Sequence, residues 1–135
     1  MSRKMLVAGL VLLICLLAVS SVYAAPPARF NGHWRGVDAY DGSNMQLTIS
    51  GGAHGEYRLK WTDDYFFCGG PEGEGIGTGT LQPDGTLYIM VHFTLPCWEG
   101  DSEGVLTLLD RGTMRLDYLN CEFCIYPETF YRPGH

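Results

Sequence analysis

Residues 86–95 read TLYIMVHFTL, and this stretch decides the fold class because its apolar side chains occupy every second position. One face of the stretch is apolar throughout and carries Leu87, Ile89, Val91, Phe93 and Leu95. The other face carries Thr86, Tyr88, Met90, His92 and Thr94. A period of two is the spacing of a β-strand with one buried face. The stretch therefore predicts a half-buried strand rather than a helix.

The same alternation recurs along the chain and is interrupted by turn-forming residues. Met45, Leu47 and Ile49 alternate, and Pro83-Asp84-Gly85 is one of several segments with turn chemistry. We expect strands near residues 32–38, 44–50, 56–62, 65–68, 76–81, 86–95, 105–110, 113–120 and 129–132. Eight or nine short strands joined by hairpins predict an all-β fold, a small antiparallel meander barrel or, alternatively, a β-sandwich.

Two segments are expected to be loops rather than strands. Residues 69–75 read GGPEGEG, and residues 96–104 read PCWEGDSEG; both are rich in glycine and acidic side chains. Between 75 and 79 every second residue is glycine, which is typical of a strand that bends or lies close to another backbone. A phosphate-binding loop would require a helix after it, and none is predicted.

The N-terminus has the pattern of a secretory signal peptide. Arg3 and Lys4 precede an apolar run over 5–19, and Val22-Tyr23-Ala24 resembles a cleavage site. We expect residues 1–24 to be removed and residues 25–135 to form one secreted, periplasmic or otherwise extracytoplasmic domain; an uncleaved anchor is the alternative. An apolar run of 15 residues is short for a membrane span.

The charge of the mature chain excludes one large class of partner. Residues 25–135 contain seven Lys or Arg and fifteen Asp or Glu, a net charge of −8, and Lys60 is the single lysine. Nucleic-acid binding requires clustered basic side chains, so no nucleic acid is expected. The predicted partner is a small molecule or a surface of another molecule.

Two points in the chain resemble lipocalin- and avidin-type β-barrels. Gly32-His33-Trp34 is a G-x-W on the first predicted strand, and Arg132 stands late on the last, where lipocalins place an arginine across the first-strand tryptophan. The resemblance implies barrel closure by Trp34 and Arg132 and transfers no ligand. The stretch from Trp34 to Pro71 is also similar to small secreted bacterial β-proteins without an assigned function.

Four cysteines remain after cleavage, an even number in an exported chain, which predicts two disulfides. Three pairings are open, and we favour Cys68–Cys97 with Cys121–Cys124. A zinc site usually has two C-x-x-C pairs and this chain has one, and a redox-active pair requires a helix or a positive charge beside it.

Aromatic residues gather near the cysteines. Six rings lie within three positions of a cysteine: Tyr65, Phe66, Phe67, Trp98, Phe123 and Tyr126. If the disulfides bring these segments to one end of the barrel, the rings form either a binding surface or a plug that closes that end. We define this set as the aromatic rim.

The sequence contains no recognisable catalytic set. It has no H-E-x-x-H, no G-x-S-x-G and no calcium-loop motif, so no metal, cofactor or catalytic residue is predicted. Three functions stay open. The favoured one is a non-enzymatic binding or accessory domain. The others are a structural or cell-surface interaction domain with a filled barrel, and a small hydrolase that uses loop carboxylates.

Overall fold

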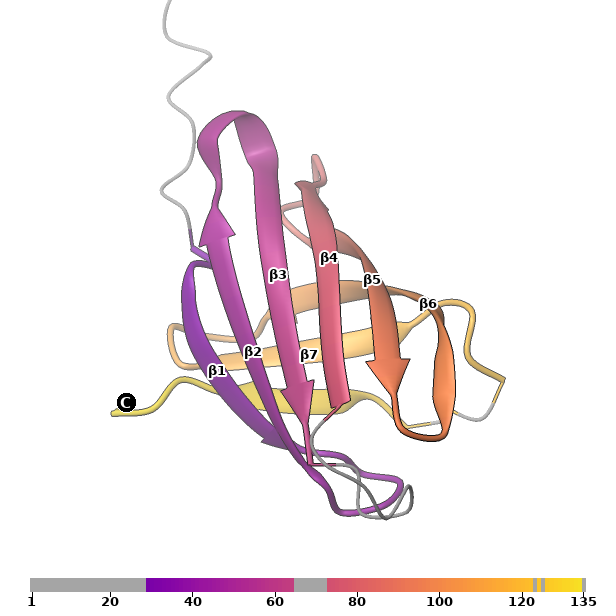
Figure 1. Ribbon diagram of the computed structural model, residues 1–135. Coiled ribbons are helices and arrows are strands. Elements are labelled where there is room, and N and C mark those ends of the chain that lie inside the picture. The colour runs from indigo at the N-terminus through magenta and orange to yellow at the C-terminus, as the bar shows by residue number, and fades with distance from the viewer. Residues whose placement is uncertain (1–28, 65–72, 123, 125, 135) are drawn as a thin grey trace, which may run out of the picture.

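The computed structural model describes residues 29–64, 73–122, 124 and 126–134, and it is a closed antiparallel β-barrel (Figure 1). Its strands pair in chain order and β1 pairs with β8, so the predicted all-β meander barrel is confirmed. The strands are β1 (Gly32–Val37), β2 (Asn44–Gly51), β3 (Glu56–Asp63), β4 (Gly73–Leu81), β5 (Leu87–Leu95), β6 (Trp98–Leu108), β7 (Thr113–Tyr118) and β8 (Glu128–Tyr131). A short 3₁₀ turn, η1 (Ala53–Gly55), joins β2 to β3.

The alternating apolar residues fill the barrel interior. In β5, Leu87, Ile89 and Val91 are buried, while Met90 and His92 on the other face are exposed. The ring of Trp61 on β3 lies at the centre, with ring centroids 5.3 Å from Phe93 and 5.2 Å from Phe130, both in edge-to-face geometry. This packing leaves the interior of the described barrel occupied by side chains from opposite walls.

Strand β4 contributes almost no side-chain volume to the interior. Its inward positions are Gly73, Gly75, Gly77 and Gly79, with Leu81 at the end of the strand, and atoms of β5 lie directly over Gly75, Gly77 and Gly79. A Cβ on Gly77 would lie 2.2 Å from the carbonyl oxygen of Met90, and one on Gly75 would lie 2.8 Å from the ring of Phe93. The glycines are therefore required for the close approach of β4 to β5, as their spacing predicted.

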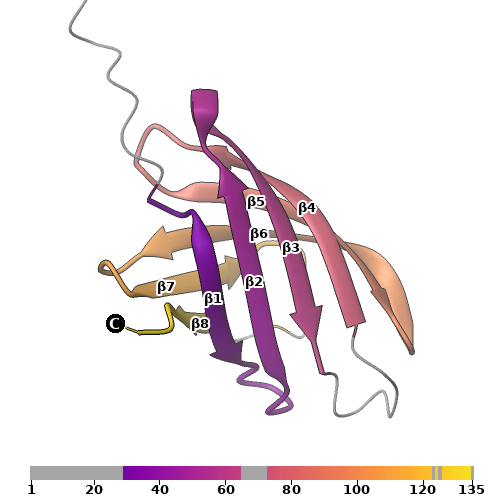
Figure 2. The same ribbon diagram turned by 60° about the vertical axis from the view of Figure 1, so that its left-hand side comes forward.

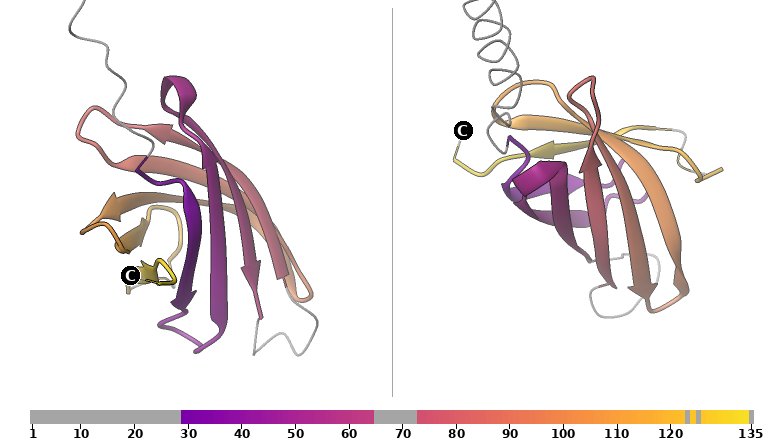
Figure 3. Two further views of the ribbon diagram at one scale, coloured as in Figure 1. Left: turned by 90° about the vertical axis from the view of Figure 1, so that its left-hand side faces the viewer. Right: turned by 90° about the horizontal axis from the view of Figure 1, so that it is seen from above.

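The two ends of the barrel sheet are held together around Trp34. Its indole Nε1 donates to the carbonyl oxygen of Phe30 at 2.9 Å, and the guanidinium carbon of Arg132 lies 4.4 Å from the ring centroid. Arg132 Nη2 also donates to the carbonyl oxygens of Arg29 and Asn31. Figure 3 shows β8 beside β1 in the curled sheet. Trp34 is fully buried, so β1 and the chain beyond β8 are joined through a side chain of the core.

The expected loop over 96–104 is wrong, because β6 begins at Trp98 and runs through most of it. The β5–β6 turn contains two residues, since Leu95 pairs with Trp98. On the inner face of this half of β6, Trp98 is followed by the small residues Gly100 and Ser102, and the ring of Trp98 covers Gly100, where a Cβ would lie 2.5 Å from Cζ2 of that ring. Small residues replace the usual apolar ones here because the tryptophan fills the space.

Other boundaries differ by a few residues. The expected loop over 69–75 is wrong at its end, because β4 already begins at Gly73 and pairs there with Asp63. The strand expected over 105–110 is the second half of β6, which ends at Leu108. The strand expected over 65–68 lies outside the described residues. Among the residues that are described, no helix has the length and hydrophobicity needed to cross a membrane.

Candidate functional site

The aromatic rim is described in part. Tyr65, Phe66, Phe67 and Phe123 lie outside the described residues, as does Cys68. Trp98 starts β6 with 47% of its surface exposed, and Tyr126 precedes β8 with 59% exposed. Cys121 and Cys124 form a disulfide, and Cys97 is disulfide-bonded as well. The structure therefore describes two exposed rim rings, each close to a cysteine in a disulfide.

Trp98 is half packed and half exposed. Its ring centroid lies 6.2 Å from that of Phe93, with the planes tilted by 39°, and its benzene edge covers Gly100. Phe93 in turn contacts Trp61, so Trp98 is the outermost of three aromatic side chains that lead out of the core. An aromatic ring supported on one side and open on the other is suited to binding an apolar group.

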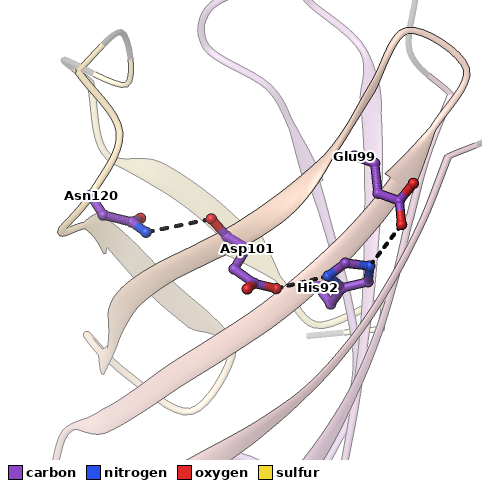
Figure 4. Close-up of polar contacts among 4 residues, drawn as sticks. All are labelled: His92, Glu99, Asp101 and Asn120. Atoms are coloured by element: carbon purple, nitrogen blue, oxygen red, sulfur yellow. Dashed lines mark hydrogen bonds and ion pairs between the residues drawn. The ribbon is translucent and has the colours of Figure 1, made fainter.

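An ion-pair network lies on the outer face of β5 and β6, close in sequence to Trp98 (Figure 4). His92 Nδ1 lies 2.8 Å from Asp101 Oδ1, and His92 Nε2 lies 3.4 Å from Glu99 Oε1. The hydrogen bond to Asp101 is the main cause that raises the pKa of His92 above its ordinary value of 6.5. Both ring nitrogens face a carboxylate, so the imidazole is held between Asp101 and Glu99.

Asn120 joins this network from the segment after β7. Its Nδ2 donates to the carbonyl oxygen of Asp101 at 3.4 Å, and its Oδ1 accepts from the amide of Glu103 at 2.8 Å. The amide of Leu119 donates to the carbonyl oxygen of Glu103 at 2.8 Å. These contacts continue the β6–β7 pairing for a short distance beyond the end of β7. Among the described residues these contacts reach no further than Asp101.

A second set of polar side chains, the buried carboxyl groups of Asp63 and Glu128, lies inside the barrel. Asp63 ends β3 and Glu128 begins β8, and both are inward-facing residues with 4% exposure. Glu128 Oε2 accepts from the amide of Ala39 at 3.1 Å. Burial, followed by the negative charges of Asp38, Asp63 and Asp41, raises the pKa of Glu128 to about 7. The side chain of Glu128 is therefore largely protonated in mildly acidic solution.

Glu128 should make the stability of the barrel depend on pH. Its pKa is 4.5 in the unfolded chain and about 7 in the folded barrel, so the folded state holds the proton more tightly. The contribution of Glu128 to stability is therefore complete below pH 4.5 and is lost as the pH rises through 7, where the buried side chain has to become a carboxylate. We expect the free energy of unfolding, measured by urea titration, to fall by up to about 3 kcal/mol between pH 4.5 and pH 8. Glu128→Gln should remove most of this slope.

His92→Gln is the control. The pKa of His92 is raised, so its protonated ring stabilises the folded state, and this contribution is lost as the pH rises, but only above 6.5. The lowered pKa values of Asp84 and Asp110 act below pH 4, outside this window. A slope that survives in Glu128→Gln and disappears in His92→Gln would contradict the assignment to Glu128.

Neither the ion-pair network around His92 nor the buried carboxyl groups were predicted from the sequence, although the spacing of the residues indicates the second. Asp63 lies two positions after Trp61, and Glu128 two before Phe130, so period two already assigned both carboxylates to the inner face. His92 pairs with Asp101 across the β5–β6 hairpin, a contact that was hidden because 96–104 was predicted to be a loop.

The part of the chain that the structure describes contains no group of three or more His, Cys, Asp or Glu arranged to hold a metal ion. The candidate features of the described residues are the half-exposed Trp98, the acidic residues of β6 beside it, and the buried carboxyl groups of Asp63 and Glu128. Comparison with family models, with curated proteins and with solved structures found no match to this chain.

Proposed function

We propose that this protein is an exported, non-enzymatic interaction domain that binds a partner on its surface, at Trp98 and the adjoining half of β6. The observation that carries the proposal is the contrast between a filled interior and a half-exposed tryptophan. Export is part of the proposal and rests on the sequence of residues 1–24. The likeness of Trp34 and Arg132 to the closing pair of lipocalin-type barrels is compatible with it and adds no ligand.

The packed interior argues against a ligand held inside the barrel. Trp34, Leu59, Trp61, Ile89 and Phe93 are each at most 6% exposed. The crevice lined by Trp61, Val91, Phe93 and Tyr118 has no room for a water molecule, whereas small-molecule sites are typically 300 Å³ or larger. Larger hollows, of about 370 to 480 Å³, lie along β1, β2, the end of β3 and β8; all three have Arg35 in their lining, one also has Asp63 and another Glu128.

The exposed half of Trp98 supports binding at the surface. A large ring held in place by Phe93 loses little conformational freedom when a partner covers it, which is why tryptophan is enriched among residues that dominate binding energy. Beside it stand the exposed carboxylates of Glu99 and Asp101. The surface therefore combines an apolar anchor with negative charge.

A small hydrolase is the second candidate, favoured by the pairing of Asp63 with Glu128 at one end of the barrel. Burial and neighbouring negative charges raise the pKa of Glu128, as happens in enzyme sites that use one carboxyl group as a general acid. Both residues are only 4% exposed, however, and a substrate has to reach them. Glycosidase assays on Glu128→Gln and on the unchanged protein would detect this activity.

Site-specific photocrosslinking tests the proposed surface. We expect p-benzoylphenylalanine at position 98, introduced into the protein in its own host, to yield one dominant adduct with a partner. The matched control is the same photoprobe at Leu109, which is also exposed but follows the far end of β6. Equal adducts at both positions, or none at 98, would contradict a binding surface at Trp98, and native mass spectrometry of a tightly held small molecule would contradict the filled barrel.

A further inference from the structure

Strand β6 is longer than the strand it pairs with on one side. It pairs with β5 from Trp98 to Leu106, but with β7 only from Gly104 to Leu108. Figure 2 shows β6 continuing past the end of β7 toward the β5–β6 turn. The stretch 98–102 therefore has β5 on one side, and along its other side no strand lies within the residues described.

The hydrogen-bond pattern shows which backbone groups face that open side. Both the amide and the carbonyl oxygen of Glu103 bond toward the β7 side, to Asn120 and Leu119, and the carbonyl oxygen of Asp101 meets Asn120. Backbone groups of a strand alternate in direction, so the amide and carbonyl of Glu99 and the amide of Asp101 point the same way. Within the part of the chain that the structure describes, no strand pairs with these groups, and we call them the β6 edge.

We propose that the β6 edge binds an extended segment of a partner protein as an added β-strand, and that this segment alternates basic and apolar residues. The proposal rests on the function proposed above and names its partner class. In strand addition, main-chain hydrogen bonds supply affinity and alternate side chains supply specificity.

The two faces of the edge set the sequence of the partner strand. On the outer face, the carboxylates of Glu99 and Asp101 are exposed and would lie beside the outward side chains of the added strand, where basic residues complement them. On the inner face, the ring of Trp98 is half exposed and covers Gly100. Apolar side chains of an added strand can pack against this ring, so the partner alternates the two types.

A second copy of this chain is a poorer occupant. Pairing of two β6 edges would bring the carboxylates of Glu99 and Asp101 against their counterparts, in a chain whose formal net charge is −6. Directly opposed like charges destabilise strand pairs, and edge charges are a common means of preventing self-association. The same charges attract a basic segment.

Amide hydrogen exchange followed by NMR tests the proposal directly. In the free protein, the amides of Glu99 and Asp101 should exchange quickly, whereas those of Trp98 and Gly100, which bond to β5, should exchange slowly. The probe is a synthetic heptapeptide of alternating lysine and valine. On binding, we expect protection of the Glu99 and Asp101 amides to rise at least tenfold, with little change at 98 and 100.

Two peptide controls separate strand addition from simple charge attraction. A peptide of the same composition with its lysines and valines in separate blocks, and an alternating peptide with N-methyl groups on its pairing amides, should each bind at least tenfold more weakly. Equal binding by the N-methylated peptide would overturn the proposal, as would saturable binding without protection at 99 and 101. Protection that grows with protein concentration in the absence of peptide would assign the edge to a second copy and overturn it as well.

A pair of variants tests the same edge from the protein side. Glu99→Pro removes an amide that faces away from β5, so the β5–β6 pairing is kept while the edge loses a donor. We expect at least a tenfold loss of affinity for the alternating peptide, against threefold or less for Glu99→Gln. If Glu99→Pro fails to fold, the N-methylated peptide decides. A partner crosslinked at position 98 together with no strand pairing at 99 and 101 would refute the inference and leave the proposed function standing.

Discussion

Replacing Gly77 with alanine should destabilise the barrel by about 3 kcal/mol or more, measured as the free energy of unfolding in urea. A Cβ at this position would lie 2.2 Å from the carbonyl oxygen of Met90 and 2.9 Å from Cα of Val91. Both obstacles are backbone atoms of the neighbouring strand, so relief requires β4 and β5 to separate. Such a separation would break the ladder that joins Gly77 to Val91.

The other glycines of β4 provide a graded control. At Gly75 the obstacles are the side chains of Phe93 and Val91 at 2.8 Å, and at Gly79 the side chain of Leu87 at 3.0 Å. Side chains can move, so we expect the loss to decrease from Gly77→Ala to Gly75→Ala to Gly79→Ala. Thr78→Ala on the outer face should cost less than about 1 kcal/mol. A Gly77→Ala protein no less stable than Gly79→Ala would show that the close approach is not what the glycines provide.

Trp34→Ala should have the largest effect of any side-chain truncation, about 4–5 kcal/mol. The change removes a fully buried ring, its hydrogen bond to the carbonyl oxygen of Phe30 and the surface over which Arg132 stacks. These contacts hold β1 against the chain beyond β8, so we expect the variant to lose cooperativity in thermal unfolding followed by circular dichroism.

Phenylalanine substitutions at two tryptophans separate the hydrogen bond from the burial. Among the described residues, Nε1 of Trp61 has no hydrogen-bond partner, whereas Nε1 of Trp34 donates at 2.9 Å. Trp34→Phe should therefore cost about 1–2 kcal/mol more than Trp61→Phe, because it leaves the carbonyl oxygen of Phe30 unsatisfied. Equal losses would mean that the Trp34 hydrogen bond adds nothing net.

The fold was predictable because the apolar residues of β2, β3 and β5 alternate without interruption. In β5 every inward residue is large and apolar, so its burial alone identifies the strand. The hairpin turns were equally clear. Gly85 adopts a φ of 86°, and Asp84 Oδ1 accepts from the amide of Thr86 at 3.0 Å, as the Pro-Asp-Gly sequence predicts.

The first half of β6 could not be predicted, because the inward residues that follow Trp98 are small. Gly100 lies under Trp98, and at Gly104 a Cβ would lie 2.6 Å from the side chain of Leu116 on β7. A strand whose inward space is filled by one tryptophan of its own and by side chains of its neighbour shows no regular hydrophobic alternation. The β6 edge was invisible in the sequence for the same reason.

Of the aromatic rim, the structure describes Trp98 and Tyr126, and the polar contacts near them could not be predicted from the sequence. Proximity to cysteines selected Trp98 and Tyr126, both of which are exposed. The contact of His92 with Glu99 and Asp101 depends on the pairing of β5 with β6, and the burial of Glu128 beside Asp63 depends on closure of the whole barrel. Contacts of that kind require the register of strands that are distant in the sequence.

The pairing of β1 with β8 means that the barrel has no complete state until its last strand is present. A chain that emerges from a pore or a ribosome with β1 first carries an open edge on that strand while β2 to β7 form. In the closed barrel β8 covers this edge at Arg35 and Gly36, and the amide and guanidinium of Arg132 tie the end of β8 to Gly112 and Arg29. Closure of the barrel therefore has to wait for the C-terminal strand, and until that strand is available the open edge of β1 can mispair or be bound by a chaperone.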